Sequence, residues 1–167
     1  MNQNITIPIR ELEKRFANVI TRLPVIAGNE VVNFALDNFK RQGFLADSFQ
    51  PWKQRKMPTK WGQNTKGGKA LLVKSGRLRR SIRITQISTQ SVTVGSDVPY
   101  AKTHNEGLRI GQIQTVKSFS RRNGQTVKGH QRRINQNIPA RPFLKESQYL
   151  TAKLKRVLTA EIMKALR

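Results

Sequence analysis

The N-terminal part of the chain carries apolar side chains at intervals of three and four positions. Within residues 8–23 these are Ile9, Leu12, Phe16, Val19, Ile20 and Leu23. This spacing places them on one side of a helix, with Pro8 in its first turn and Pro24 as its expected end. A second helix is predicted for residues 28–43 from Val32, Ala35, Leu36 and Phe39. The pattern thus predicts two short helices joined by a turn.

Residues 44–76 lack a sustained helical or strand periodicity over most of their length. They contain glycines, prolines and seven basic side chains, and loops of this length in small domains are usually functional or disordered. Trp52 and Trp61 lie in this loop. Either they stack on nucleic-acid bases, or they anchor the loop on the core, which we favour because tryptophan is usually well buried. We predict a long irregular basic loop.

Alternating apolar residues in the middle of the chain predict an antiparallel hairpin with one buried face. The inward residues are Leu78, Ile82 and Ile84 in the first strand and Val92 and Val94 in the second. Arg79 and Arg83 alternate with the inward residues of the first strand and are expected to point to solvent. Residues 97–99, Asp-Val-Pro, end the second strand.

A second hairpin is predicted for residues 110–133. Its turn contains Asn123 and Gly124, the pair favoured in tight hairpin turns. The flanking segments carry few apolar and many basic side chains. We therefore expect the whole stretch 108–138 to project from the domain as a basic arm.

The C-terminal segment again shows helical spacing. Its apolar positions are Leu150, Leu154, Val157, Leu158, Ile162, Ala165 and Leu166. Two N-terminal helices, two hairpins and a C-terminal helix predict an α+β fold. The simplest architecture is one domain over residues 1–167, with a small antiparallel sheet and helices on one face. The loop 44–76 and the arm 108–138 extend from it.

The net charge of the chain indicates an anionic partner. The chain of 167 residues has 32 Lys and Arg against 9 Asp and Glu, a net charge of +23. Residues 51–133 contribute +17 of this excess. A cationic field attracts anionic partners, so we favour contact with nucleic acid or an acidic protein over a merely solvated surface. The residues expected to make this contact are Trp52, Lys53, Arg55, Lys56, Lys60, Trp61, Arg79, Arg83, Lys117, Arg121, Arg122, Lys128, Arg132 and Arg133.

The sequence offers little for catalysis. The absence of cysteine excludes disulfides, thiolate chemistry and cysteine-ligated metals. His104 and Glu106 resemble a general base held by a carboxylate, but the sequence shows no nucleophile beside them, and a structural hydrogen bond explains the pair more readily. No catalytic residue, metal or cofactor is predicted. No apolar run approaches the roughly 18 residues of a membrane span, and the N-terminus lacks the features of a signal peptide.

Three segments follow one another as LLVKSGRLRRSI (residues 71–82), YAKTHNEG (100–107) and PARPFL (139–144). Together with FKRQG (39–43) and PW (51–52), they resemble the phage virion morphogenesis family, the tail-completion proteins of Mu-like and related tailed phages. The resemblance spans about residues 30–150, and the stretch 108–138 departs from the family in its length. The residues expected to fix the geometry are Ser75, Gly76, Leu78, Tyr100, His104, Glu106, Gly107, Arg141, Pro142 and Phe143.

The resemblance implies a non-enzymatic structural protein of the virion neck or tail end, assembled in the host cytoplasm. It implies a ring of copies of the chain, for example a hexamer, that joins tail to head. The expected partners are further copies, neighbouring neck or tail proteins and DNA in the lumen, without a membrane. Charge alone allows an alternative, a nucleic-acid-binding module resembling a ribosomal protein. An esterase or nuclease around His104 and Glu106 ranks below both.

Overall fold

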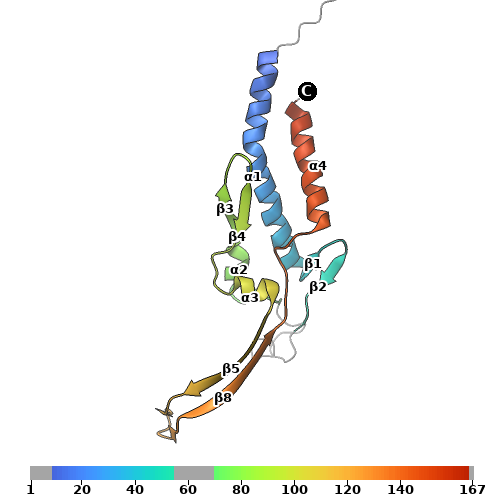
Figure 1. Cartoon of the computed structure of the whole chain (residues 1–167). Helices are drawn as coiled ribbons and strands as arrows, with labels where there is room; N and C mark the ends of the chain where they lie inside the picture. The colour runs from blue at the N-terminus through green and yellow to red at the C-terminus, as the bar shows by residue number, and fades with distance from the viewer. Residues whose placement is uncertain (1–8, 55–69, 166–167) are drawn as a thin grey trace, which may run out of the picture.

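The protein has an elongated α+β fold in a computed structural model that describes residues 9–54 and 70–165 (Figure 1). Helix α1 (Ile9–Arg41) and helix α4 (Gln148–Ala165) run side by side at one end. Strands β5 (Leu108–Val116) and β8 (His130–Ile138) form an arm at the other end. The strands pair as four separate two-stranded antiparallel sheets. The α+β class is confirmed, but the one small sheet that we expected is divided into hairpins.

Helix α1 is continuous through Pro24, so the prediction of two helices separated at this residue is wrong. An internal proline costs a helix about 3 kcal/mol because it removes a hydrogen bond and its ring crowds the preceding turn. Packing along the helix offsets this cost. Pro24 and Gly28 are buried, and further along Phe34 and Phe39 enter the core. Gly28 is therefore a contact point within the helix rather than its start.

The contact at Gly28 joins α1 to the hairpin of β3 (Arg83–Ile87) and β4 (Val92–Gly95). A Cβ atom at Gly28 would lie 2.6 Å from Cδ1 of Ile84 and 2.7 Å from Cγ2 of Val92. Only glycine lets the hairpin approach the helix this closely. The predicted inward residues of this hairpin thus pack on α1.

The first strand of that hairpin begins later than predicted. Residues that we expected in the strand form the short helix α2 (Arg77–Arg80) instead. Gly76 has φ +70°, a left-handed conformation that turns the chain into α2. The four-residue interval between Leu78 and Ile82 fits one face of a helical turn as well as it fits alternate strand positions, and both side chains are buried. The strand then starts at Arg83.

The described ends of the predicted loop 44–76 are ordered against the core. Strands β1 (Gly43–Leu45) and β2 (Phe49–Pro51) form a short hairpin. Trp52 follows it, is 3% exposed, and donates from Nε1 to the carbonyl oxygen of Pro142 at 2.8 Å. This burial agrees with the anchoring role and excludes base stacking by Trp52 in this conformation. Four of the predicted contact residues, Arg55, Lys56, Lys60 and Trp61, lie outside the described residues.

The main core lies where α1 meets the middle segments of the chain. The Phe39 ring packs against Trp52 and Phe143, with ring centroids 5.5 and 5.0 Å apart. The aliphatic members of this cluster are Ala35, Leu71, Leu78, Ile82, Val98 and Ala101. A second cluster of Phe34, Phe44 and Leu150 joins α1 to the start of α4. Residues from 35 to 143 thus share one core.

By length and composition alone, α1 also qualifies as a membrane-spanning helix. Core helices pass the same test, which makes a single such helix weak evidence. The C-terminal half of α1 contributes Phe34, Ala35 and Phe39 to the core. Glu30 also forms an ion pair with Lys153 of α4 at 2.7 Å. The C-terminal half of α1 is thus part of the core, whereas only 22% of the apolar window of the helix is buried. The absence of a membrane partner stays a prediction.

The arm is a regular hairpin with nine residue pairs, from Leu108 opposite Ile138 to Val116 opposite His130. Its tip carries the short strands β6 (Phe119–Ser120) and β7 (Thr126–Val127). Gly124 has φ +81° in the turn between them, and its backbone N–H donates to the carbonyl oxygen of Arg121 at 2.9 Å. Asn123 has no positive φ, so the turn is not the type I′ form, which needs one at both residues. Most side chains of β5 and β8 are exposed.

Candidate functional site

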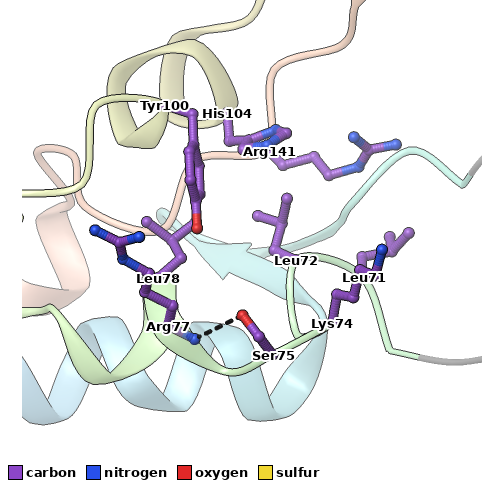
Figure 2. A pocket seen from close by; sticks show the side chains of 9 residues that line it. All are labelled: Leu71, Leu72, Lys74, Ser75, Arg77, Leu78, Tyr100, His104 and Arg141. Carbon is purple, nitrogen blue, oxygen red and sulfur yellow. Dashed lines mark hydrogen bonds between the residues drawn. The ribbon is translucent and has the colours of Figure 1, made fainter.

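The three segments singled out in the sequence meet around one pocket of about 360 Å³ (Figure 2). Its walls are formed by Leu71, Leu72, Lys74, Ser75, Arg77, Leu78, Tyr100, His104 and Arg141. Residues 71–78 form one wall, α3 (Ala101–Glu106) and its preceding residue Tyr100 form another, and Arg141 comes from the segment before α4. Residues far apart in sequence therefore build one site.

Asn105 fixes the segment that carries Arg141. Its Oδ1 accepts hydrogen bonds from the backbone N–H groups of Phe143 and Leu144 at 3.0 and 3.1 Å. Its Nδ2 donates to the carbonyl oxygen of Leu144 at 2.9 Å. From α1, the buried Asn38 donates to the carbonyl oxygen of Phe143 at 3.2 Å. Two asparagines thus hold residues 143–144 against α1 and α3.

Arg141 is 7% exposed and connects the pocket to the loop. Its Nε donates to the carbonyl oxygen of Lys53 at 3.0 Å, and its backbone N–H donates to the carbonyl oxygen of His104 at 2.8 Å. These contacts keep the guanidinium within the pocket wall. Arg141 is therefore a structural residue that also contributes a fixed positive charge.

The opposite wall is set by Gln42 and Gly76. The side chain of Gln42 accepts a hydrogen bond from the backbone N–H of Leu71 and donates to its carbonyl oxygen at 3.4 Å. At Gly76, Arg80 turns back and donates from Nη2 to the carbonyl oxygen of Ser75 at 3.0 Å. The leucine side chains of residues 71–78 are thereby directed to the core and to the pocket floor.

His104 does not form the predicted pair with Glu106. Its Nδ1 is buried and lacks a hydrogen-bond partner among the described residues, whereas Glu106 is exposed. Burial and the Arg141 charge lower the pKa of His104 below its usual 6.5. The ring packs edge-on against Tyr100, with centroids 5.8 Å apart. Within the chain, the hydrogen bond across a turn that we favoured for these residues is therefore absent, and so is the general-base arrangement that we ranked below it; a hydrogen bond across an interface between molecules stays a prediction.

The pocket suits anion binding better than hydrolysis. Lys74, Arg77 and Arg141 line it, and none of its lining residues is acidic. Ser75 and His104 stand on opposite walls in Figure 2, so the histidine is not placed to activate the serine hydroxyl. Within residues 9–54 and 70–165, no group of three His, Asp or Glu side chains is placed to hold a metal ion. The arrangement can attract a negatively charged group but offers no visible nucleophile.

The chain was compared with family models, with curated proteins and with solved structures. The family model described as the phage virion morphogenesis family matches residues 27–163. The chain belongs to this family. The match includes all three pocket segments and the arm, and it assigns the chain a role in the assembly of the phage virion. No curated protein and no solved structure matches the chain.

In this virion morphogenesis protein, the predicted contact residues fall into two regions. Lys53, Arg79 and Arg83 are exposed near the core, and Arg83 is paired with Asp97 at 3.2 Å. The other predicted contact residues with a positive charge that the structure describes are all exposed on the arm: Lys117, Arg121, Arg122, Lys128, Arg132 and Arg133. Arg132 donates from Nε and Nη2 to Oε1 of Gln114 across the strands, at 2.9 and 2.7 Å. The arm thus carries a cationic surface separate from the pocket.

Sequence reasoning missed several residues that build the pocket. Lys74 and Arg77 were within the recognised segment but not singled out as site residues, and Asn105 and Gln42 gave no signal of their own. A polar residue between apolar helix positions, such as Asn38, is the one available hint, because a buried amide needs hydrogen-bond partners. Which backbone groups would satisfy it depends on the tertiary fold.

Proposed function

We propose that the chain is a non-enzymatic adaptor of the phage neck or tail end, which forms a ring of its own copies and joins the tail to the head. The observation that carries this proposal is the arm formed by β5 and β8. Its side chains are mostly exposed, and a two-stranded sheet is only marginally stable in water by itself. We infer that neighbouring molecules in the particle cover it.

The surface of the arm indicates what such a neighbour presents. Ile113 is 68% exposed and Phe119 is 48% exposed, so the arm offers apolar contact area. Residues 108–138 carry seven Lys and Arg and no Asp or Glu. An acidic protein surface or DNA in the lumen fits this charge. The free edges of β5 and β8 also allow a neighbour to add a strand.

The elongated shape supports a ring. A closed ring uses a heterologous interface, in which one patch of a molecule meets a different patch of the next. The helical end formed by α1 and α4 and the cationic arm lie at opposite ends of the molecule (Figure 1), which leaves the sides of the molecule for contacts within the ring. In this arrangement, the helices and the core form the ring wall while the arm reaches an adjacent ring or the channel.

Mass and shape in solution test the proposal. Native mass spectrometry and negative-stain electron microscopy are expected to give one closed ring, for the chain alone or with a tail-tube protein. A monomer that binds duplex DNA or RNA with a steep salt dependence would instead support the nucleic-acid-binding module. A saturable hydrolytic activity that disappears in a His104→Ala variant would contradict the non-enzymatic role.

Deleting residues 112–131 tests the contribution of the arm. Gly111 lies opposite Asn135, so the deletion leaves residues 132–134 as a short turn between paired strands. We expect a folded chain, with an unchanged circular-dichroism spectrum of its helices, that no longer joins its partner in a particle-completion assay. Particles completed at the wild-type level would show that the arm is dispensable.

A further inference from the structure

The pocket combines two kinds of chemistry that select its occupant. Arg77 and Arg141 supply positive charge, while Leu72, Leu78 and Tyr100 supply apolar surface (Figure 2). At about 360 Å³ it lies near the lower limit of ligand-sized pockets, which begin at about 300 Å³. A pocket of this kind has room for one or two side chains and suits a carboxylate next to an apolar group.

A peptide fits this pocket better than a nucleic acid. Phosphates of a duplex bind cations that reach out from a protein surface, whereas Arg141 is 7% exposed and held in the pocket wall. Leucine side chains contribute nothing to phosphate binding. The exposed arginines suited to DNA lie on the arm.

One exposed turn of the same chain has the complementary chemistry. Between β1 and β2, Asp47 is exposed and is free of ion pairs within the described residues, and Phe49 is 43% exposed. The turn is held in place by the residue before α4, because the Ser147 hydroxyl donates to the carbonyl oxygens of Leu45 and Ala46 at 2.7 and 3.1 Å. The Phe49 ring packs over Gly43 of β1 and is partly exposed. The hairpin therefore presents a carboxylate in its turn and part of an aromatic ring on β2.

The β1–β2 turn and the short helices α2 and α3, which carry the pocket residues Leu78 and His104, lie on different sides of α1. Figure 1 shows the β1–β2 hairpin on one side of the lower end of α1, and α2 and α3 on the other. A turn on one side cannot enter the pocket of its own chain, but it can enter the pocket of the next chain. This is the arrangement that a head-to-tail ring needs.

We propose that the pocket receives the β1–β2 turn of the neighbouring copy. In this contact the Asp47 carboxylate meets the cations of the pocket, and the Phe49 ring covers the leucines and Tyr100. The inference rests on the proposed ring and identifies its interface.

Cysteine cross-linking tests this contact, because the chain has no cysteine of its own. Asp47→Cys is mixed with Arg77→Cys, and disulfide-linked dimers are measured after mild oxidation. A disulfide needs Cα atoms within about 7 Å, so it reports direct contact. The matched control mixes Asp47→Cys with Gln90→Cys, an exposed position in the β3–β4 turn. We expect about tenfold more linked dimer from the first mixture, because the contact raises the effective thiol concentration.

Charge reversal gives a second measurement that does not depend on oxidation. Asp47→Arg and Arg77→Asp should each reduce the ring fraction in native mass spectrometry, and the two together in one chain should restore it. Circular dichroism of each variant reports whether it is folded.

The outcomes separate this inference from the proposed function. If rings form but neither the selective cross-link nor the charge-reversal rescue is observed, the proposed interface is wrong and the proposed ring still stands. A chain that stays monomeric and gives no cross-link contradicts both. Protection of the Arg77→Cys thiol from maleimide by duplex DNA, without a selective cross-link, would assign the pocket to nucleic acid and overturn the proposal.

Discussion

Replacing Asn105 by alanine removes three hydrogen bonds that join α3 to the segment before α4. Each hydrogen bond contributes about 0.5–1.5 kcal/mol, and buried groups left without a partner cost more. The backbone N–H of Phe143 would lose its acceptor at a residue that is 2% exposed. We expect Asn105→Ala to lower the free energy of unfolding by about 2–4 kcal/mol. For a chain of this length that corresponds to a lower melting temperature by about 5–15 °C.

Urea unfolding followed by tryptophan fluorescence measures this loss. Trp52 is buried and donates a hydrogen bond to Pro142, next to the affected segment, so its emission reports the region directly. A Trp61→Phe background restricts the signal to Trp52. Asn105→Asp keeps an acceptor for two of the bonds and should lose less than alanine does. Asn137→Ala, at an exposed position of β8, is the surface control and should change the unfolding free energy by less than about 0.5 kcal/mol.

The reasoning is refuted if Asn105→Ala unfolds within about 0.5 kcal/mol of the wild type. The pocket wall would then be held by the core alone. An aspartate variant as unstable as the alanine variant would show that the two accepted hydrogen bonds contribute little.

Two further predictions concern the same wall. Gly107 has φ +82° and ψ 168°, a region essentially restricted to glycine, and a Cβ atom there would lie 2.8 Å from the backbone nitrogen of Ala140. Gly107→Ala should therefore lower the free energy of unfolding in urea by about 3 kcal/mol or more. In the control Gly111→Ala, the nearest neighbour of the added Cβ atom would lie at 3.5 Å, so the loss should be far smaller. Equal losses in the two variants would contradict this. Because the pKa of His104 is lowered in the folded state, the unfolded chain binds the proton first, and stability should fall as the pH drops below 6.5 toward the folded pKa. Unfolding free energies at about pH 7.5 and 5.5 should differ less in His104→Gln than in the wild type, and an unchanged difference would refute the assignment.

Local patterns in the sequence were sufficient wherever neighbouring residues decide the structure. The apolar spacing after residue 148 predicted α4, and the Asn123-Gly124 pair correctly placed the turn at the tip of the second hairpin. The order of three short segments was enough to indicate the family that the comparison then confirmed. The charge of a segment follows from counting its Lys, Arg, Asp and Glu residues and does not depend on the fold. The cationic character of residues 108–138 was therefore evident from the sequence.

Only the tertiary structure decided how distant residues share contacts. Pro24 stays inside a helix because packing on α1 offsets its local cost, and Leu78 belongs to a helical turn because Gly76 redirects the chain. Asn38 finds its partner at Phe143, 105 positions away. No local propensity encodes such a pairing, since its energy exists only once the core has brought the two segments together. The sequence shows that the chain contains these cations and leucines, but only the fold shows that they lie around one pocket.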